Sequence, residues 1–187
     1  MCVISLSRLL AAPILEATRL GALHAHASLL PDYKGPNPFF WMVKRNERMG
    51  GVSLHWMTSV PDAGEVVARR ELPLFPGMTA REHDSALAIL AAGAFYVALQ
   101  GLATGELATT PNEATNTPFA RNPRGEDLHL DGLPTVEHAL WFHEVASAYG
   151  TPRLSVTGGP VTRVSRTHFV GSTEFQCRDG IMWGMPA

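Results

Sequence analysis

The longest apolar run in the sequence, Ala86 to Leu99, constrains the fold most. The residues Thr79 to Glu82 in front of it read Thr-Ala-Arg-Glu, the pattern of a helix capping box. Apolar side chains then recur at helical spacing as far as Leu102. The pattern predicts a long helix that other parts of the chain cover on more than one side. Because a membrane span needs roughly 20 residues, the run predicts no bilayer crossing.

Short β-like segments on both sides of this run predict an α/β fold. The expected strands are Val3–Leu6, Gly21–His26, Gly51–Met57 and Glu65–Leu74. Further helices are expected at residues 8–19, 39–47 and 134–149. After Arg153, short β-like runs alternate with glycine-containing turns, which indicates a small β appendage of three to five strands.

The same pattern divides the chain into three parts. We expect residues 1–104 to form the core that contains the candidate site described below, residues 105–133 a polar linker, and residues 134–187 a helix followed by the β appendage. The net charge of −2 and the absence of a basic cluster argue against nucleic acid and anionic lipid as partners. Cys2 and Cys177 are too few and too distant to indicate a disulfide framework. Arg8 and Glu16 interrupt the apolar N-terminus, so we expect a cytoplasmic protein without a signal peptide.

The stretch from His24 to Pro36 contains the residues best suited to chemistry. Histidines two positions apart on a strand project from the same face, which applies to His24 and His26. A loop rich in proline and glycine follows, and Asp62 lies in a turn after a later strand. Two imidazoles and a carboxylate brought together could perform acid–base chemistry or hold a metal ion.

The residues from His24 to Gly35 resemble the signature loop of the formyltransferase family, in which Asn-x-His-x-Ser-Leu-Leu-Pro precedes an aromatic or basic pair and a glycine. The likeness continues through Gly51–Met57 and through residues 62–67. In the family, the segment equivalent to residues 62–67 contains the catalytic aspartate. His26 and Asp62 are 36 positions apart (62 − 26), as in the family. Three motifs in order make the resemblance specific, and it covers about Val3 to Leu102.

This resemblance implies a partial Rossmann-like sheet flanked by helices, with the small β-rich segment appended. It implies transfer of a formyl group from 10-formyltetrahydrofolate to an amine of a small metabolite. In that reaction an asparagine and the residue equivalent to His26 stabilise the oxyanion, and the residue equivalent to Asp62 orients the histidine and helps to move protons. The resemblance places folate contacts at Pro61, Ala63 and Gly64, and substrate contacts at Ser28, Tyr33 and Lys34. This interpretation assigns no metal ion.

Two departures from the family pattern affect these expectations. His24 replaces the asparagine, and an imidazole can donate a hydrogen bond to an oxyanion but can also act as a base. The family's first four strands have no counterpart, which leaves the first strand as an exposed sheet edge. We expect a second copy of the chain, another subunit or the C-terminal β segment to cover this edge.

Three other functions are consistent with the same residues. The cluster could act without folate as a hydrolase, dehydratase or cyclase, which the additional base His24 favours. It could instead be a metal site with two histidines and one carboxylate. A binding or regulatory module that has lost catalysis is the third. His55 is expected to be a half-buried strand residue outside the site.

Overall fold

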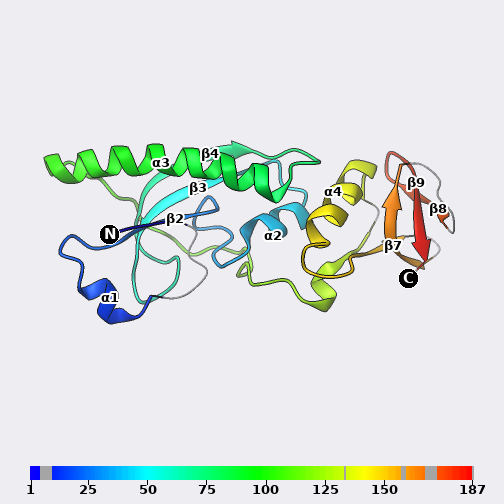
Figure 1. The fold of residues 1–187 in the computed structure, drawn as a ribbon, viewed down its shortest axis with the longest axis horizontal. Helices are drawn as coiled ribbons and strands as arrows, with labels where there is room; N and C mark the ends of the chain where they lie inside the picture. Colours follow the sequence, from blue (N-terminus) through cyan, green and yellow to red (C-terminus); the bar gives the residue numbers. More distant parts are fainter. Residues whose placement is uncertain (5–9, 133, 157–158, 167–171, 187) are drawn as a thin grey trace. The chain divides into compact units, whose positions relative to one another are not determined.

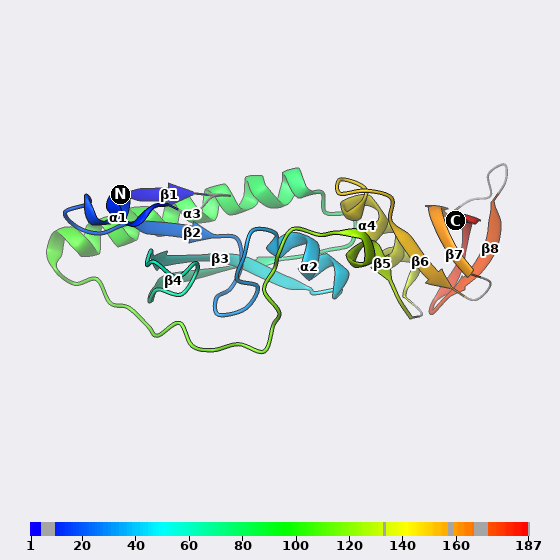
Figure 2. The same ribbon diagram turned by 90° about the horizontal axis from the view of Figure 1, so that it is seen from below.

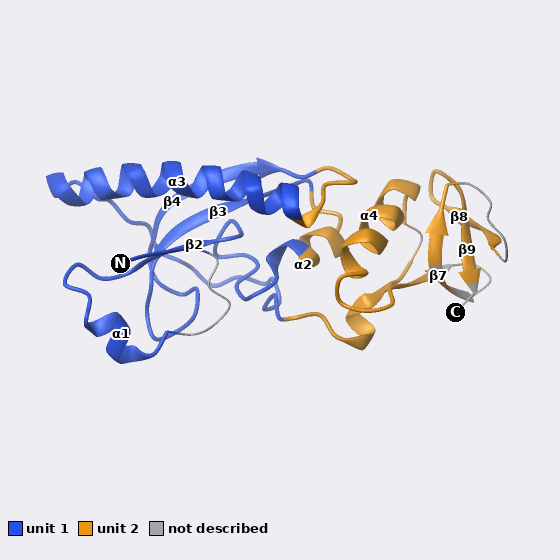
Figure 3. Ribbon diagram, viewed as in Figure 1, with its two compact units in different colours: residues 1–39, 48–74, 81–121 blue, residues 40–47, 75–80, 122–187 orange. Residues whose placement is uncertain are grey.

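The computed structural model describes residues 1–4, 10–132, 134–156, 159–166 and 172–186. They form two compact units, which Figure 3 distinguishes by colour. Unit 1 contains residues 1–39, 48–74 and 81–121, and unit 2 contains residues 40–47, 75–80 and 122–187. Each unit combines segments from different parts of the chain, so the units do not test the predicted division into residues 1–104, 105–133 and 134–187. That division stays a prediction.

Unit 1 is built on a four-stranded sheet in the order β1-β2-β3-β4 (Figure 1). Its strands are β1 (Cys2–Ile4), β2 (Leu23–His26), β3 (Met49–Trp56) and β4 (Val66–Pro73). β1 is parallel to β2, and the other two pairs are antiparallel. Together with its helices, this sheet confirms the α/β class. The helix α1 (Ala12–Glu16) is shorter than predicted, and it begins where proline is tolerated, with Pro13 in its first turn. The first part of the predicted helix, residues 8 and 9, lies outside the described residues.

The helix α3 (Ala80–Thr104) runs along one face of this sheet (Figure 1). Leu87, Ala91, Ala94, Phe95 and Ala98 of α3 form one core with Leu23 and Ala25 of β2 and with Val52 and Leu54 of β3. The prediction that α3 is covered on more than one side is wrong, because Ile89 is 75% exposed and Tyr96 is 65% exposed. Among the described residues this helix extends beyond the apolar run to 25 residues, and by length and composition alone it is long and apolar enough to span a membrane. The expectation that the chain does not cross a bilayer stays a prediction.

Strand alternation separates this core from a polar face. Since Leu23, Ala25, Val52 and Leu54 pack toward α3, their strand neighbours project from the opposite face of the sheet. These neighbours are His24 and His26 of β2 and Ser53 and His55 of β3. All four are less than one tenth exposed. The hydrophobic pattern that fixes the register of the core therefore also places the histidines together.

Residues 106–121, which follow α3, run beside the loops of unit 1 rather than forming a strand or helix (Figure 2). Several hydrogen bonds attach them to the rest of the unit, including the following. Thr110 forms an isolated bridge with Val66, Asn112 bonds to the loop between β3 and β4, and Ala120 bonds to Lys34 and Asn37.

Unit 2 contains α4 (Val136–Ala146), the short helix η1 (Gly125–Leu128) and a second sheet, and most of α2 (Pro38–Lys44) also falls in it. The second sheet has the order β5-β6-β7-β9-β8. Its strands are β5 (His129–Leu130), β6 (Arg153–Val156), β7 (Gly159–Ser165), β8 (Thr173–Cys177) and β9 (Gly180–Pro186). Among the described residues these strands pair only with one another. Cover of the β1 edge by the C-terminal β segment, by a second copy or by another subunit stays a prediction.

Gly64 offers a direct test of how tightly the loop between β3 and β4 is held. A Cβ atom added at Gly64 would overlap the backbone oxygen of Trp56, which cannot move without disturbing β3. We expect Gly64→Ala to lower the free energy of unfolding by about 2–4 kcal/mol. Gly93→Ala is the control, because Gly93 has no atom within 4 Å of the added Cβ and lies inside α3. That variant should gain about 0.5–1 kcal/mol. Equal urea midpoints for Gly64→Ala and the parent protein would contradict the packing described.

Candidate functional site

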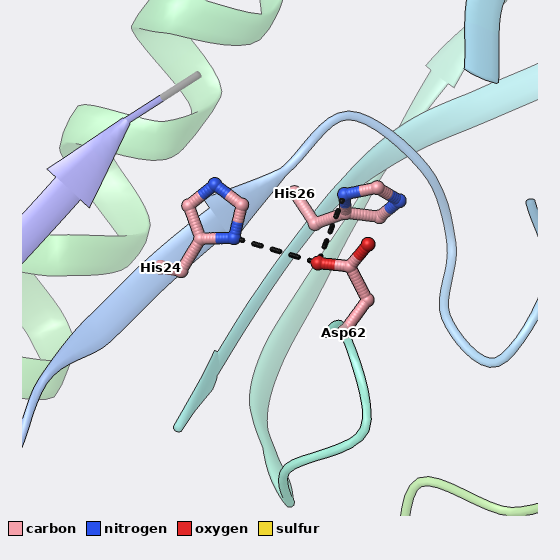
Figure 4. A group of neighbouring side chains, drawn as sticks. All are labelled: His24, His26 and Asp62. Atoms are coloured by element: carbon pink, nitrogen blue, oxygen red, sulfur yellow. Dashed lines mark ion pairs between the residues drawn. The ribbon is translucent and has the colours of Figure 1, made fainter. Parts of the chain in front are cut away.

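A pocket of about 360 Å³ lies over the polar face of the first sheet. His24, His26 and His55 contribute side chains from β2 and β3, and the loop between β3 and β4 contributes Asp62. Figure 4 shows His24 and His26 pointing from one strand toward the Asp62 carboxylate. His26 and Asp62 therefore lie close together in one pocket, as predicted.

A single carboxylate oxygen, Asp62 Oδ1, faces three imidazoles. It lies 3.7 Å from His24 Nδ1, 3.6 Å from His26 Nδ1 and 3.6 Å from His55 Nε2. The nitrogens His24 Nδ1 and His55 Nε2 lie 3.2 Å apart. The expectation that His55 lies half-buried outside the site is wrong, since it is 1% exposed and contacts this group. The feature that brings His55 into the site is the antiparallel pairing of β2 with β3, which places His55 directly opposite His24.

The backbone around Asp62 holds its carboxylate in place. Asp62 has a left-handed φ of 51°, a conformation that aspartate and asparagine adopt more readily than most residues. Gly35 N donates to Asp62 Oδ2 at 2.9 Å. The side-chain amide of Asn112 donates to the carbonyl oxygens of Asp62 at 2.8 Å and of Gly64 at 3.0 Å. Asn112 was not predicted, because it lies 50 positions from Asp62 in an irregular segment and no local pattern connects them.

Two carbonyl oxygens set the hydrogen positions on the imidazoles. His26 Nε2 lies 3.0 Å from Tyr33 O, and His55 Nδ1 lies 2.8 Å from Trp56 O. A carbonyl oxygen only accepts, so each of these nitrogens carries a hydrogen. In the neutral rings, His26 Nδ1 and His55 Nε2 are then lone pairs that face Asp62. His24 Nδ1 is the remaining donor toward this centre, while His24 Nε2 is buried without a described partner.

The other predicted site residues occupy different positions around the pocket. Pro61 lines it, together with Gly35 and Pro36 of the signature loop. The residues predicted to bind folate or substrate at other positions are not among its described lining; they are Ala63, Gly64, Ser28, Tyr33 and Lys34. Their binding roles stay predictions.

Three of these residues support the loop through hydrogen bonds. Ser28 is fully buried, and its hydroxyl donates to Asp32 O. The Tyr33 carbonyl orients His26, and the Lys34 carbonyl accepts from Ala120 N. Backbone groups and the Ser28 hydroxyl thus both hold the loop that follows His26.

The electrostatics of the cluster favour an ionised carboxylate beside a neutral imidazole. Burial acts to raise the pKa of Asp62, but the interactions with His24, His55 and His26 and the Gly35 N–H outweigh it, so this pKa is lowered. Burial lowers the pKa of His26 below its ordinary value of 6.5, and the attraction of Asp62 offsets this only in part. Near pH 7 the pair therefore offers a carboxylate and an unprotonated nitrogen.

The lowered pKa of His26 predicts a pH-dependent stability. Below its ordinary pKa of 6.5, an unfolded His26 binds a proton that the folded protein excludes, so stability is lost as the pH falls from about 6.5. Asp62 acts at lower pH, below its ordinary value of 3.8. We expect the free energy of unfolding of the wild type to fall between pH 6.5 and 5 by up to about 1.4 kcal/mol per pH unit more than that of His26→Gln. Both proteins are first treated with a chelator, so that no metal ion occupies the histidines. Urea unfolding at several pH values measures this difference, and parallel curves would contradict it.

Comparison with known proteins gives one family match. Residues 1–99 match the family model described as formyl transferase. The chain is 34% identical over 129 residues to the methionyl-tRNA formyltransferase of Chelativorans sp. and 38% identical over 125 residues to that of Sorangium cellulosum. These matches cover 69% and 67% of this chain, but only 42% and 40% of the relatives. The chain thus spans about two fifths of their length.

Solved structures show the same fold at lower identity. HypX from Aquifex aeolicus, in complex with tetrahydrofolic acid, has a TM-score of 0.70 and 18% identity, and the match covers 98% of this chain and 34% of that one. The formyltransferase PseJ from Anoxybacillus kamchatkensis, in complex with a UDP-linked formamido sugar and tetrahydrofolate, has a TM-score of 0.55 and 22% identity. That match covers 64% of this chain and 62% of PseJ.

Proposed function

Because the chain belongs to the formyltransferase family, we propose that its pocket transfers a formyl group from 10-formyltetrahydrofolate to an amine of a small metabolite. The observation that carries this proposal is the meeting of His24, His26 and Asp62 at an accessible pocket, with the Asp62 oxygen 3.6 Å from His26 Nδ1. An ionised carboxylate beside an unprotonated imidazole suits a reaction that must take a proton from an attacking amine.

The geometry supports the following sequence of events. The amine nitrogen attacks the formyl carbon, and His26 Nδ1 accepts the proton that the amine loses. The Asp62 carboxylate stabilises the imidazolium that forms, as its position 3.6 Å away allows. The bond from the formyl carbon to the folate nitrogen then breaks, and the proton passes from His26 to that nitrogen. The products are a formamide and tetrahydrofolate.

His24 supports the developing oxyanion in this proposal. Its Nδ1–H is the donor that remains once Tyr33 O and Trp56 O have fixed the other two rings. The Nδ1 atom of histidine lies about as far along the side chain as the amide nitrogen of asparagine. A histidine in place of the family's asparagine can therefore present a hydrogen bond at a similar position.

The variant His24→Asn tests the proposal against a folate-independent acid–base enzyme. We expect tetrahydrofolate release from 10-formyltetrahydrofolate, measured with a panel of amines, to stay within about tenfold of wild type, because the amide keeps one oxyanion donor. Chemistry that uses His24 as a base would instead be abolished. Failure of wild type to bind 10-formyltetrahydrofolate at millimolar concentration would sink the proposal.

The structural relatives support the choice of folate and of a small acceptor. HypX and PseJ carry tetrahydrofolate in their structures, and the PseJ complex also holds a sugar nucleotide bearing a formamido group. On this proposal the loop at Pro61, Ala63 and Gly64 contacts the folate, and the loop at Ser28, Tyr33 and Lys34 contacts the acceptor. We place the reaction in the cytoplasm, where folate carriers are available.

The exposed edge of β1 is the proposed contact with a second copy or another subunit. In the described sheet β1 has β2 as its one neighbour, and Ile4 is 53% exposed. An unpaired edge strand offers backbone donors and acceptors to a further strand. Analytical ultracentrifugation should therefore show a dimer that Ile4→Pro weakens.

A further inference from the structure

The cluster around Asp62 contains more hydrogen-bond acceptors than hydrogens to satisfy them. Tyr33 O takes the hydrogen of His26, and Trp56 O takes that of His55, which leaves a bare nitrogen of each ring facing Asp62 Oδ1. His24 Nδ1 can supply a single hydrogen to this centre. The three lone-pair atoms His26 Nδ1, His55 Nε2 and Asp62 Oδ1 thus share one donor. Each of the two nitrogens lies 3.6 Å from Asp62 Oδ1, which is too long for a direct hydrogen bond.

Most of the separations among these atoms are close to those between the ligands of a tetrahedral metal ion. Ligands about 2.0–2.1 Å from zinc stand about 3.3–3.4 Å apart at the corners of a tetrahedron. Four of the six edges of such a tetrahedron compare with this value: 3.2 Å between His24 Nδ1 and His55 Nε2, and 3.7, 3.6 and 3.6 Å from Asp62 Oδ1 to the nitrogens of His24, His26 and His55. Ligand atoms of His24, His26 and Asp62 also lie within 4.8 Å of one another.

The surroundings of the cluster match those of metal-binding histidines. Such a histidine usually donates its second ring N–H to a carbonyl or carboxylate, which fixes the ring orientation. His26 does this with Tyr33 O at 3.0 Å, and His55 with Trp56 O at 2.8 Å. Asp62 Oδ2 is held by Gly35 N, which leaves Oδ1 toward the histidines. His24 departs from the pattern, because its Nε2 has no described partner.

We propose that His26 Nδ1, His55 Nε2, His24 Nδ1 and Asp62 Oδ1 bind one divalent first-row transition metal ion, with zinc the best fit to three nitrogens and one oxygen. The inference goes beyond the two-histidine alternative drawn from the sequence because it requires His55. It does not rest on formyl transfer. The lone pair of His26 cannot bind a metal ion and accept a proton at once, so bound zinc suppresses the proposed transfer.

The test uses the full chain without a histidine tag. After treatment with a chelator, the protein is titrated with Co²⁺ and with Zn²⁺ in separate experiments. We expect one ion per chain and the intense visible absorption of four-coordinate Co²⁺, which Zn²⁺ then displaces. Absence of binding at millimolar metal, or the weak spectrum of six-coordinate Co²⁺, overturns the proposal without any variant.

His55→Asn identifies the ligand that the sequence did not reveal. Its amide can keep the hydrogen bond to Trp56 O while removing the Nε2 ligand, so we expect metal affinity to fall at least about 100-fold. The matched control is His138→Gln, which removes another buried histidine whose Nε2 donates to Val43 O. Its affinity should be unchanged. Circular dichroism verifies that both variants fold, and unaltered binding by folded His55→Asn overturns the ligand set.

The outcomes separate this inference from the proposed function. Formyl transfer is assayed in chelator-treated protein, where the metal plays no part. Metal binding without formyl transfer supports the site and refutes the proposed reaction. Formyl transfer without metal binding does the reverse.

Discussion

Asp62→Asn should reduce the rate of formyl transfer about 10³-fold while the fold is retained. The substitution removes the negative charge that stabilises a protonated His26, and general acid–base assistance is worth 10²–10⁴-fold. Asparagine accepts the left-handed backbone conformation found at Asp62 and can still receive the hydrogen bond from Gly35 N. The loss should therefore appear in kcat, measured from tetrahydrofolate release.

Asp32→Asn is the control for Asp62→Asn. Asp32 is a second carboxylate of unit 1, and its side chain bonds to Thr115 and Thr117 rather than to the histidines. This variant should keep its rate within a few-fold of the parent protein. Comparable rates for both variants would mean that the Asp62 charge takes no part in the reaction.

His26→Gln should reduce the rate about 10²–10³-fold. Glutamine can extend its amide nitrogen to the Tyr33 carbonyl, so the support of the signature loop is retained. It has no lone-pair nitrogen to accept the proton of the attacking amine. Rate measurements above pH 8 provide the control, since hydroxide can then take the proton that the attacking amine loses and should recover part of the wild-type rate without His26. A loss smaller than tenfold at pH 7 would contradict the assigned role.

The fold could be predicted where short-range patterns determine it. The alternation of β2, the turn at Asp62 and the apolar run of α3 are local, and each predicted element is found within a few residues of its expected place. The cover of α3 was misjudged because a uniformly apolar sequence does not tell which face meets the sheet. Here one face packs on β2 and β3, and the other leaves Ile89 and Tyr96 exposed.

The site could be predicted only where one motif contained its residues. His24, His26 and Asp62 follow from the signature loop and the later turn. His55 and Asn112 depend on antiparallel pairing and on the path of residues 106–121, which are properties of the folded chain. The substrate contacts assigned to Tyr33 and Lys34 stay predictions, because they depend on a bound acceptor.

A crystal structure of the protein with bound 10-formyltetrahydrofolate, or a stable formyl-folate analogue, is the most direct test of the account. We predict that the formyl group lies in the pocket between the sheet and the loop at Pro61, with its oxygen within hydrogen-bonding distance of His24 and its carbon facing His26 and Asp62. A folate bound elsewhere, or none bound at saturating concentration, would contradict the proposal that this cluster handles a folate-borne formyl group.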